Sequence, residues 1–291
     1  MAQILVTGST GTVGSAVTQA LLAAGHAPRV MLRDPKKPVP AGCTVVQGDL
    51  QRPETLAEAF AGSDTLFLLT ALAQDEAEQG LAGVEAAKKA GFRRIVYMTV
   101  HALDSALYIP HFGSKKPAVD AIEASGLEYV LLEPNNFYQN DHWFRDAILE
   151  YGVYPQPIGS AGLSRVDVRD IADAAVSALT RPLGGDLRCP LVGPDALTGP
   201  QVAEVYADLL GKPVVYGGDD LEAWGAQASQ MMPEWLVHDL KIMYGHFQEH
   251  GLKATEQDLA IQEKYLGHAP RPFAAFAREA VAAWTGTAAA G

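Results

Sequence analysis

Cysteine is scarce in this sequence of 291 residues, which contains only Cys43 and Cys189. The two do not form a Cys-x-x-Cys pattern, and no charged leader with an apolar core precedes the first strand-like residues. Few, widely separated thiols are typical of a reducing compartment, whereas small secreted domains use cysteine-dense frameworks. We therefore expect two free thiols, no thiolate metal site and a cytoplasmic protein.

A surplus of positive charge and a long apolar run are also missing. Lysine and arginine number 22 against 34 acidic residues, which gives a formal net charge of −12. This charge opposes binding to nucleic acid or to an anionic membrane surface. No apolar run approaches the roughly 18 residues that a membrane-spanning helix needs. We expect a globular protein, a monomer or homodimer, with no membrane and no direct nucleic-acid partner.

A glycine-rich turn stands near the N-terminus. The apolar run 4–6 breaks into three glycines spaced three apart, and an amphipathic segment follows. A strand that enters a helix through such a turn points free N–H groups and the positive end of the helix dipole at one place, which suits a pyrophosphate. A plain strand-to-helix turn is the alternative. The predicted cofactor-binding residues here are Gly8, Thr10, Gly11, Thr12, Val13 and Gly14.

The three glycines have different predicted roles. Gly8 allows the tight turn, Gly11 lets the backbone approach the phosphates without a Cβ in the way, and Gly14 lets the helix lie close to the strand. The loop after the next predicted strand bears on the choice between NAD(H) and NADP(H).

That loop follows a predicted strand at 29–32 and contains Arg33, Asp34, Lys36 and Lys37. In dinucleotide-binding folds this strand end faces the adenosine ribose, where a carboxylate binds the 2′-hydroxyl of NAD and an arginine binds the 2′-phosphate of NADP. Arg33 comes first after the strand, so we favour NADP(H), with Arg33 and Lys37 as its contacts. Asp34 keeps NAD(H) possible, and a solvated basic loop is the alternative.

Six short apolar segments alternate with helical ones and predict an α/β fold with a doubly wound parallel Rossmann sheet. Ligands bind at the carboxyl ends of the strands in such a sheet. Residues near those ends are therefore predicted to bind the cofactor: Asp49, Leu50, Thr70, Ala71, Leu72, Thr99, Pro134, Asn136 and Phe137. Capping of the next turn is an alternative role for Asp49.

The composition changes after Pro134, where a stretch rich in asparagine and aromatic residues begins. We expect residues 1–150 to form the dinucleotide-binding domain, to which 164–195 returns with a strand and a helix. Residues 196–291 are expected to form a smaller, mostly helical C-terminal substrate-binding lobe, to which 135–163 contribute.

A set of motifs runs in order through nearly the whole chain. They are Val6-Thr7-Gly8-Ser9-Thr10-Gly11-Thr12-Val13-Gly14, Leu32-Arg33-Asp34-Pro35, Gly48-Asp49-Leu50, His111-Phe112-x-Ser114-Lys115, Pro134-x-x-Phe137-x-x-Asn140, Asp170-Ile171-Ala172, and Pro272-Phe273 before a final helix ending in Trp284. Together they resemble the NmrA-like branch of the atypical short-chain dehydrogenase/reductases. The resemblance implies NADP(H) on a Rossmann core, with Lys115 near the nicotinamide ribose and a smaller lobe over the substrate cleft.

Lys115 and His111 are the predicted catalytic residues. Typical short-chain reductases have a tyrosine proton donor four residues before the lysine, and His111 occupies that position here. A histidine can donate a proton near neutral pH, while a polar residue that orients the helix of Lys115 is the alternative. Lys115 could bind the ribose hydroxyls and lower the pKa of a neighbouring group, or it could be a solvated lysine.

The NmrA-like family, which this chain resembles, includes reductases of quinones, dyes and aromatic ethers, and also redox-sensing regulators that bind the cofactor. Hydride transfer to a quinone or dye depends mainly on positioning and on a dry cleft, so a missing tyrosine has little effect there. We predict an NADPH-dependent reductase of an aromatic or quinone-like acceptor; a non-catalytic NADP(H)-binding redox sensor that acts through a protein partner is the alternative. The predicted substrate-binding residues are Tyr138, His101, Trp224 and Met232.

The apolar stripe from Trp224 to Phe247 is typical of a core, although some of its residues could line a cleft. His246 and His250 have the spacing of two ligands on one helix face, but no third ligand is evident. No metal site is therefore predicted.

Overall fold

The computed structural model describes residues 3–286 and divides the chain into two compact units. The first unit is Met1–Pro134, Val168–Leu191 and Ala260–His268; the second is Asn135–Asp167, Val192–Leu259 and Ala269–Gly291. The chain therefore leaves the first unit after Pro134 and not near residue 150, and a short segment at 260–268 returns to it. The cofactor-binding and substrate-binding roles of the two parts stay predictions.

A seven-stranded sheet forms the centre of the first unit. Its strands are β1 (Ile4–Val6), β2 (Arg29–Leu32), β3 (Thr44–Gln47), β4 (Thr65–Leu68), β5 (Arg94–Met98), β6 (Glu128–Pro134) and β8 (Arg188–Leu191). Their order is β3-β2-β1-β4-β5-β6-β8, and every pairing is parallel. The order reverses between β1 and β4, which is where a Rossmann sheet binds its ligand. The predicted doubly wound Rossmann fold is thus confirmed.

The register places apolar side chains in rows across this sheet. Leu5 pairs with Leu66, Leu66 with Ile95 and Ile95 with Tyr129. All residues of β1, β4 and β5 are buried, as expected for parallel strands that are covered by helices on both faces. The prediction of six strands missed β8. Pro190 argues against a strand in the sequence, but a proline is tolerated in β8 because this strand lies at the edge of the sheet.

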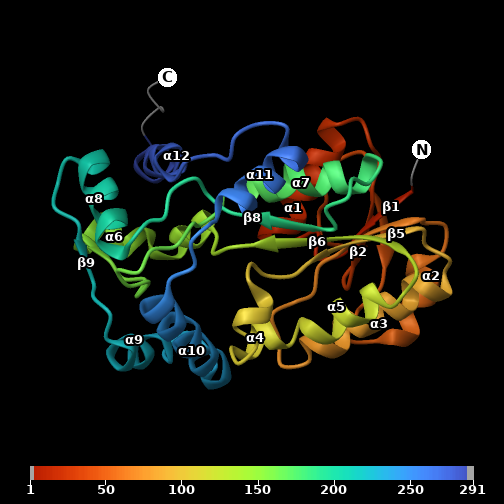
Figure 1. Cartoon of the computed structure of the whole chain (residues 1–291), viewed down its shortest axis with the longest axis horizontal. Coiled ribbons are helices and arrows are strands. Elements are labelled where there is room, and N and C mark those ends of the chain that lie inside the picture. The colour runs from red at the N-terminus through yellow and green to blue at the C-terminus, as the bar shows by residue number, and fades with distance from the viewer. Residues whose placement is uncertain (1–2, 287–291) are drawn as a thin grey trace. The chain divides into compact units, whose positions relative to one another are not determined.

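Helices cover both faces of the sheet (Figure 1). One face carries α1 (Thr12–Ala23) and α7 (Val168–Thr180), which pack on each other, and the other carries α3 (Glu76–Lys89) and α5 (Lys116–Glu123). The smaller elements between the strands are η1 (Pro53–Thr55), α2 (Leu56–Phe60), η2 (Leu103–Ser105) and α4 (Pro110–Gly113), and α11 (Glu256–Leu266) lies near the end of the chain.

The segment that contains His111 and Lys115 forms two helices. Ser114 and Lys115 separate α4 from α5. Pro117 lies in the first turn of α5, where a backbone N–H would have no hydrogen-bond partner within the helix, so proline is tolerated there. Lys115 is the N-cap residue of α5.

The second unit is mostly helical. It contains η3 (Tyr138–Phe144), α6 (Arg145–Tyr151), α8 (Gly199–Leu210), α9 (Leu221–Ala228), α10 (Glu234–His250) and α12 (Phe273–Thr285). Two short strands, β7 (Val153–Tyr154) and β9 (Val215–Tyr216), pair in parallel. Thr198 caps α8 in a capping box with Gln201.

The predicted strand after Ser164 does not form in the described chain. Leu163 and Val166 make only single bridges, with Leu197 and Leu252 and with Phe137. The segment is nevertheless buried, because the side chain between these bridges, Arg165, enters a polar network. Within residues 3–286, no helix has the length and apolar character needed to cross a membrane.

Candidate functional site

The glycine turn between β1 and α1 is built as the spacing predicts. Gly8 has φ +66°, and a Cβ added there would lie 2.8 Å from the Leu69 side chain. A Cβ on Gly14 would lie 2.1 Å from the carbonyl oxygen of Gly8, so only glycine lets α1 approach the turn this closely. At Gly11, in contrast, the nearest atom to an added Cβ would be the Gly8 oxygen at 3.4 Å.

The first turn of α1 can receive an anion. Gly11 is its N-cap residue, and within residues 3–286 no side chain caps the helix there. The first N–H groups of a helix have no intrahelical partner, and they carry the positive end of the helix dipole. Thr12, Val13 and Gly14 supply these groups, so the turn fits the pyrophosphate of a dinucleotide.

A cavity of about 380 Å³ adjoins the turn. Its lining includes Ser9 and Thr10 from the turn, Ser15 from α1 and Lys37 from the loop after β2. Ser9 is 6% exposed, and its hydroxyl has no hydrogen-bond partner in the described chain. A buried hydroxyl without a partner beside a lysine provides donors for an anionic group such as a phosphate.

The loop after β2 places its charged residues differently. Arg33 and Lys37 are both exposed, and Lys37 lines the cavity whereas Arg33 does not. The carboxylate of Asp34 accepts a hydrogen bond of 3.0 Å from the backbone N–H of Lys36. Asp34 thus stabilises its own turn, which favours its structural role over a ribose contact.

Asp49 adopts the capping role. Its carboxylate accepts from the N–H of Gln51 at 3.1 Å, and its carbonyl accepts from Arg52 N at 2.9 Å. The neighbouring Leu50 is buried. A contact of either residue with adenine stays a prediction.

The loops after β4, β5 and β6 bring several predicted residues to neighbouring strand ends. Thr70 is buried, while Ala71 and Leu72 are exposed. After β5, the N–H of Thr99 donates to Leu132 and the N–H of His101 donates to Pro134 O at 3.0 Å, which ties this loop to β6.

Lys115 lies in a buried polar cluster. Its Nζ is 2.5 Å from Oε1 of Glu76, the first residue of α3, and the two side chains are 10% and 2% exposed. Glu76 also accepts from Thr70 Oγ1 at 2.7 Å and from Ser114 Oγ at 3.1 Å. Tyr97 of β5 is fully buried nearby, and its hydroxyl has no hydrogen-bond partner in the described residues.

The charges of the cluster keep Lys115 protonated. Burial alone lowers the pKa of its ammonium group, but the interactions with Tyr97 and Glu76 outweigh this effect and raise the pKa above its ordinary value. Burial raises the pKa of Tyr97, although Lys115 opposes the rise. At neutral pH the pair is therefore an ammonium beside a neutral phenol.

His111 stands in α4, half-buried, with its ring edge-on to Phe112 at 4.8 Å between centroids. Its role as a proton donor stays a prediction.

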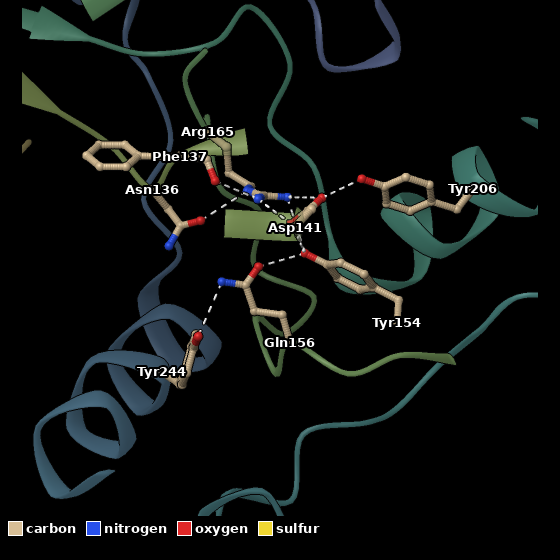
Figure 2. A network of polar contacts seen from close by, with 8 residues as sticks. All are labelled: Asn136, Phe137, Asp141, Tyr154, Gln156, Arg165, Tyr206 and Tyr244. Carbon is tan, nitrogen blue, oxygen red and sulfur yellow. Dashed lines mark hydrogen bonds and ion pairs between the residues drawn. The ribbon is translucent and has the colours of Figure 1, made fainter. Parts of the chain in front are cut away.

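A second buried polar network lies in the second unit (Figure 2). Arg165 Nη2 donates to Asp141 Oδ1 at 2.7 Å, and neither side chain has exposed surface. Asp141 also accepts from the hydroxyls of Tyr154 and Tyr206, at 3.3 and 2.9 Å. The network continues through Gln156, which accepts from Tyr154.

Arg165 also holds two of the predicted cofactor-binding residues. It donates to Asn136 Oδ1 at 3.1 Å and to the carbonyl oxygen of Phe137 at 2.8 Å. Asn136 thereby has a structural partner, and its contact with a cofactor stays a prediction. Tyr138, predicted to bind substrate, is a core residue: it is fully buried and packs on Phe273.

The other predicted substrate residues differ in exposure. Trp224 of α9 is partly buried and meets the Tyr244 ring edge-on at 5.0 Å between centroids, which agrees with the core alternative. Met232 is partly buried after α9, whereas His101 is 6% exposed. Their roles in substrate binding stay predictions.

Three potential metal ligands do come together in the first unit. Donor atoms of Asp170, Asp173 and His268 lie within 4.8 Å of one another. His268 Nε2 is 3.2 Å from an Asp173 carboxylate oxygen, so an ion pair accounts for their approach. The sequence analysis did not predict that these three residues lie close together.

The sequence also gave no indication of Glu76 or Arg165. An acidic residue in the first turn of a helix is ordinary, and the partner of Glu76 lies 39 positions away along the chain. Asp141 and Arg165 are 24 positions apart. Only the sequence order of the strands and helices could have suggested that these groups meet.

Comparison with known proteins agrees with this architecture. The chain is 34% identical to an NAD(P)H azoreductase of Xenophilus azovorans over 97% of its length and 99% of that protein's. Its structure is similar to an NADPH-dependent quinone oxidoreductase of Escherichia coli, with a TM-score of 0.85, 24% identity and coverage of 96% of this chain and 100% of the other. A triphenylmethane reductase of Citrobacter sp. gives a TM-score of 0.83 at 24% identity, with coverage of 96% and 99%.

The model of the NmrA-like family matches residues 1–277, which include the glycine turn, Lys115 and most of the second unit. The chain therefore belongs to the NmrA-like family.

Proposed function

We propose that this protein is an NAD(P)H-dependent reductase that transfers a hydride to an electron-poor conjugated acceptor, such as a quinone or a dye. NADP(H) is the preferred cofactor. The glycine turn carries the proposal, because its geometry leaves room for a pyrophosphate at an uncapped helix start. The acceptor class is supported by the relatives, which are named as reductases of azo compounds, quinones and triphenylmethane dyes.

The residues of the first unit have separate roles in this proposal. The N–H groups after Gly11 bind the pyrophosphate. Lys37 and Ser9 provide donors from the cavity for a 2′-phosphate, and Arg33 adds a positive charge from the exposed loop. Bound NADPH supplies the hydride.

Lys115 has the chemistry to bind ribose hydroxyls. A lysine ammonium has three N–H donors, and in the described chain its hydrogen bond goes to Glu76. Two donors remain for a ligand. Quinone and dye acceptors spread or neutralise the charge that hydride addition creates, so a tyrosine acid is not required for them.

NADPH consumption by the purified protein tests the function directly. The acceptors are quinones, azo dyes and cationic triphenylmethane dyes, with a simple aliphatic ketone as the comparison. We expect turnover with at least one conjugated acceptor and little with the ketone. If NADPH binds but no acceptor raises its consumption above the blank, the reductase proposal is wrong and a sensor is favoured.

The same assay assigns the roles of Lys115 and His111. Lys115→Met is expected to weaken NADPH binding and turnover together, because it removes the buried ammonium. His111→Phe keeps an aromatic ring beside Phe112 but cannot donate a proton. Quinone turnover that is unchanged in this variant would show that no acid is needed at this position, whereas a large loss would identify His111 as the donor.

A further inference from the structure

We propose that Glu76 is a positioning residue of the cofactor site: its buried carboxylate holds the Lys115 ammonium group in the orientation that binds the ribose of the nicotinamide nucleotide. This proposal rests on the proposed function, since it assumes that the first unit binds NAD(P)H. It adds a residue from a different helix to the site.

Glu76 uses all of its carboxylate oxygens in hydrogen bonds, whereas Lys115 uses only one of its three N–H donors in the described chain. Glu76 accepts from Lys115, Thr70 and Ser114, so both of its oxygens are used. Lys115 donates to one partner in the described chain and has two N–H groups left. A buried ammonium seldom leaves donors unused. The unused donors point to a ligand rich in acceptor oxygens, which a ribose is.

The location of Glu76 fits this role. It is the first residue of α3, directly after the loop that leaves β4, and β4 is the neighbour of β1 at the point where the strand order reverses. Thr70, which donates to Glu76, belongs to that same loop. The carboxylate thus ties the loop after β4 to the junction of α4 and α5, where Lys115 and Ser114 lie.

The alternative is that Glu76 only stabilises the fold. A buried ion pair contributes little net stability, but the removal of one partner leaves the other charge unpaired in the interior. Both views predict that loss of Glu76 destabilises the protein. They differ in what happens to Lys115 as a charged ligand, because only the positioning role acts through its ammonium.

The charge of Lys115 depends on few groups. The titratable groups that act on it are Tyr97 from β5 and Glu76 from α3. Without the Glu76 charge, one of the interactions that oppose the effect of burial is lost, so the pKa of Lys115 is lower than in the wild type. The ammonium then becomes neutral at a lower pH than in the wild type.

The test compares the wild type, Glu76→Gln, Lys115→Met and the double variant. Glutamine keeps the size of the side chain, and its one carbonyl oxygen can still accept from either Thr70 or Ser114, which donate to different oxygens of Glu76. Glu78→Gln, two residues along α3 and exposed, is the matched control. For each protein, the dissociation constant of NADPH is measured from pH 7 to 9.5 without any acceptor, and thermal unfolding confirms that it folds.

We expect the wild type and Glu78→Gln to bind NADPH with little change over this range. Glu76→Gln is expected to bind roughly tenfold or more weakly as the pH rises, since a charge-assisted hydrogen bond is lost. In the Lys115→Met background, the Glu76 substitution should have no further effect on binding. NMR titration of the Lys115 ε position, assigned by its absence from Lys115→Met, should show the lower pKa directly.

Two results would overturn the proposal. One is an unchanged titration of Lys115 in Glu76→Gln; the other is an equal loss of binding from the Glu76 substitution with and without Lys115. If Glu76→Gln does not fold, Glu76→Asp retains the charge but shortens the side chain, so Lys115 should stay charged but lose its position. NADPH binding is then expected to weaken at every pH where Lys115 is present, and an equal loss in the Lys115→Met background would overturn the proposal. The acceptor assay is separate, so a protein that binds NADPH but reduces nothing would contradict the proposed function and leave this test intact.

Discussion

The guanidinium of Arg165 lies 2.7 Å from the carboxylate of Asp141, and both side chains are entirely buried. The hydroxyls of Tyr154 and Tyr206 both donate to Asp141 of this pair (Figure 2). The pair also supports the backbone at Phe137. A buried pair of this kind makes the fold sensitive to the loss of either partner.

Asp141→Asn should destabilise the protein strongly. The substitution leaves Arg165 charged, because a guanidinium stays protonated in proteins even when it is buried. An unpaired buried charge costs about 3–5 kcal/mol of unfolding free energy. Urea unfolding measures the loss.

The matched control is Asp146→Asn, which breaks the exposed pair with Arg145. Exposed pairs contribute about 0–1 kcal/mol, so we expect a small change. Equal losses in the two variants would show that the buried network does not support the second unit.

Gly11→Ala and Gly14→Ala should separate cofactor binding from folding. The Gly11 backbone, with φ −88° and ψ 174°, is open to any residue, and its Cβ would meet only the Gly8 oxygen at 3.4 Å. We expect a stability loss of about 1 kcal/mol or less, but NADPH binding at least roughly tenfold weaker because the Cβ stands between the backbone and the phosphates.

Gly14→Ala is expected to lose stability as well, since its Cβ would lie 2.1 Å from the Gly8 oxygen. Overpacking of this kind typically costs about 1–3 kcal/mol or more. Gly184→Ala is the control, because an added Cβ there has nothing within 4 Å. Calorimetric titration with NADPH and urea unfolding give the two quantities. Wild-type affinity in Gly11→Ala would contradict the pyrophosphate assignment.

Arg33→Asp should change the choice of cofactor. The reversed charge repels a 2′-phosphate but leaves the hydroxyl of NADH unaffected, so we expect NADPH affinity to fall roughly tenfold to a hundredfold and NADH affinity to stay nearly constant. Titration with both nucleotides measures this difference, and NADH is the internal control. Similar losses for both would remove Arg33 from the 2′-phosphate site.

Lys37→Ala gives an independent measure of the same site, because Lys37 lines the cavity beside the glycine turn whereas Arg33 does not. We expect a selective loss of NADPH affinity here too. A larger effect at Lys37 than at Arg33 would place the 2′-phosphate in the cavity.

The sheet and the glycine turn could be predicted because their signals are local. Strands buried on both faces, such as β4, appear as continuous apolar runs, and the turn needs glycine at defined positions. The strand β8 was missed because Pro190 argues against a strand unless the sheet edge is known. The exposure of a side chain also cannot be predicted from these local signals. Tyr138 follows the end of a strand, where residues of a ligand pocket commonly lie, but it is fully buried.

The polar networks could not be predicted because their partners are distant in sequence. Lys115 was identified from a motif, but its partner Glu76 belongs to another helix, and their approach depends on the packing of α3 against α5. The loop after β2 was ambiguous for a different reason. Arg33 suits a 2′-phosphate and Asp34 suits a ribose hydroxyl, and only the folded turn shows that Asp34 accepts from the backbone N–H of Lys36.

Glu128→Gln should make stability less dependent on acid pH. Glu128 accepts from Arg94, whose side chain is 4% exposed and also donates to the carbonyls of Ala178 and Arg181. The hydrogen bond from Arg94 lowers the pKa of Glu128 below its usual value, with Arg93 adding to the effect. The folded state therefore binds the proton of this carboxyl less readily than the unfolded chain does.

The sign of the effect follows from this difference. The stabilisation is present above the ordinary glutamate pKa of about 4.3 and is lost as the pH falls through the lower, folded value. Because Glu128 is 45% exposed, we expect only about 1 kcal/mol at pH 7. Urea unfolding at several pH values between 7 and 3 should show Glu128→Gln less stable than the wild type at pH 7, with the two converging at pH 3.

Glu85→Gln, in an exposed pair with Lys89, is the control that should follow the wild type throughout. A gap between Glu128→Gln and the wild type that persists undiminished at pH 3 would mean that packing, and not the charge, stabilises this end of β6.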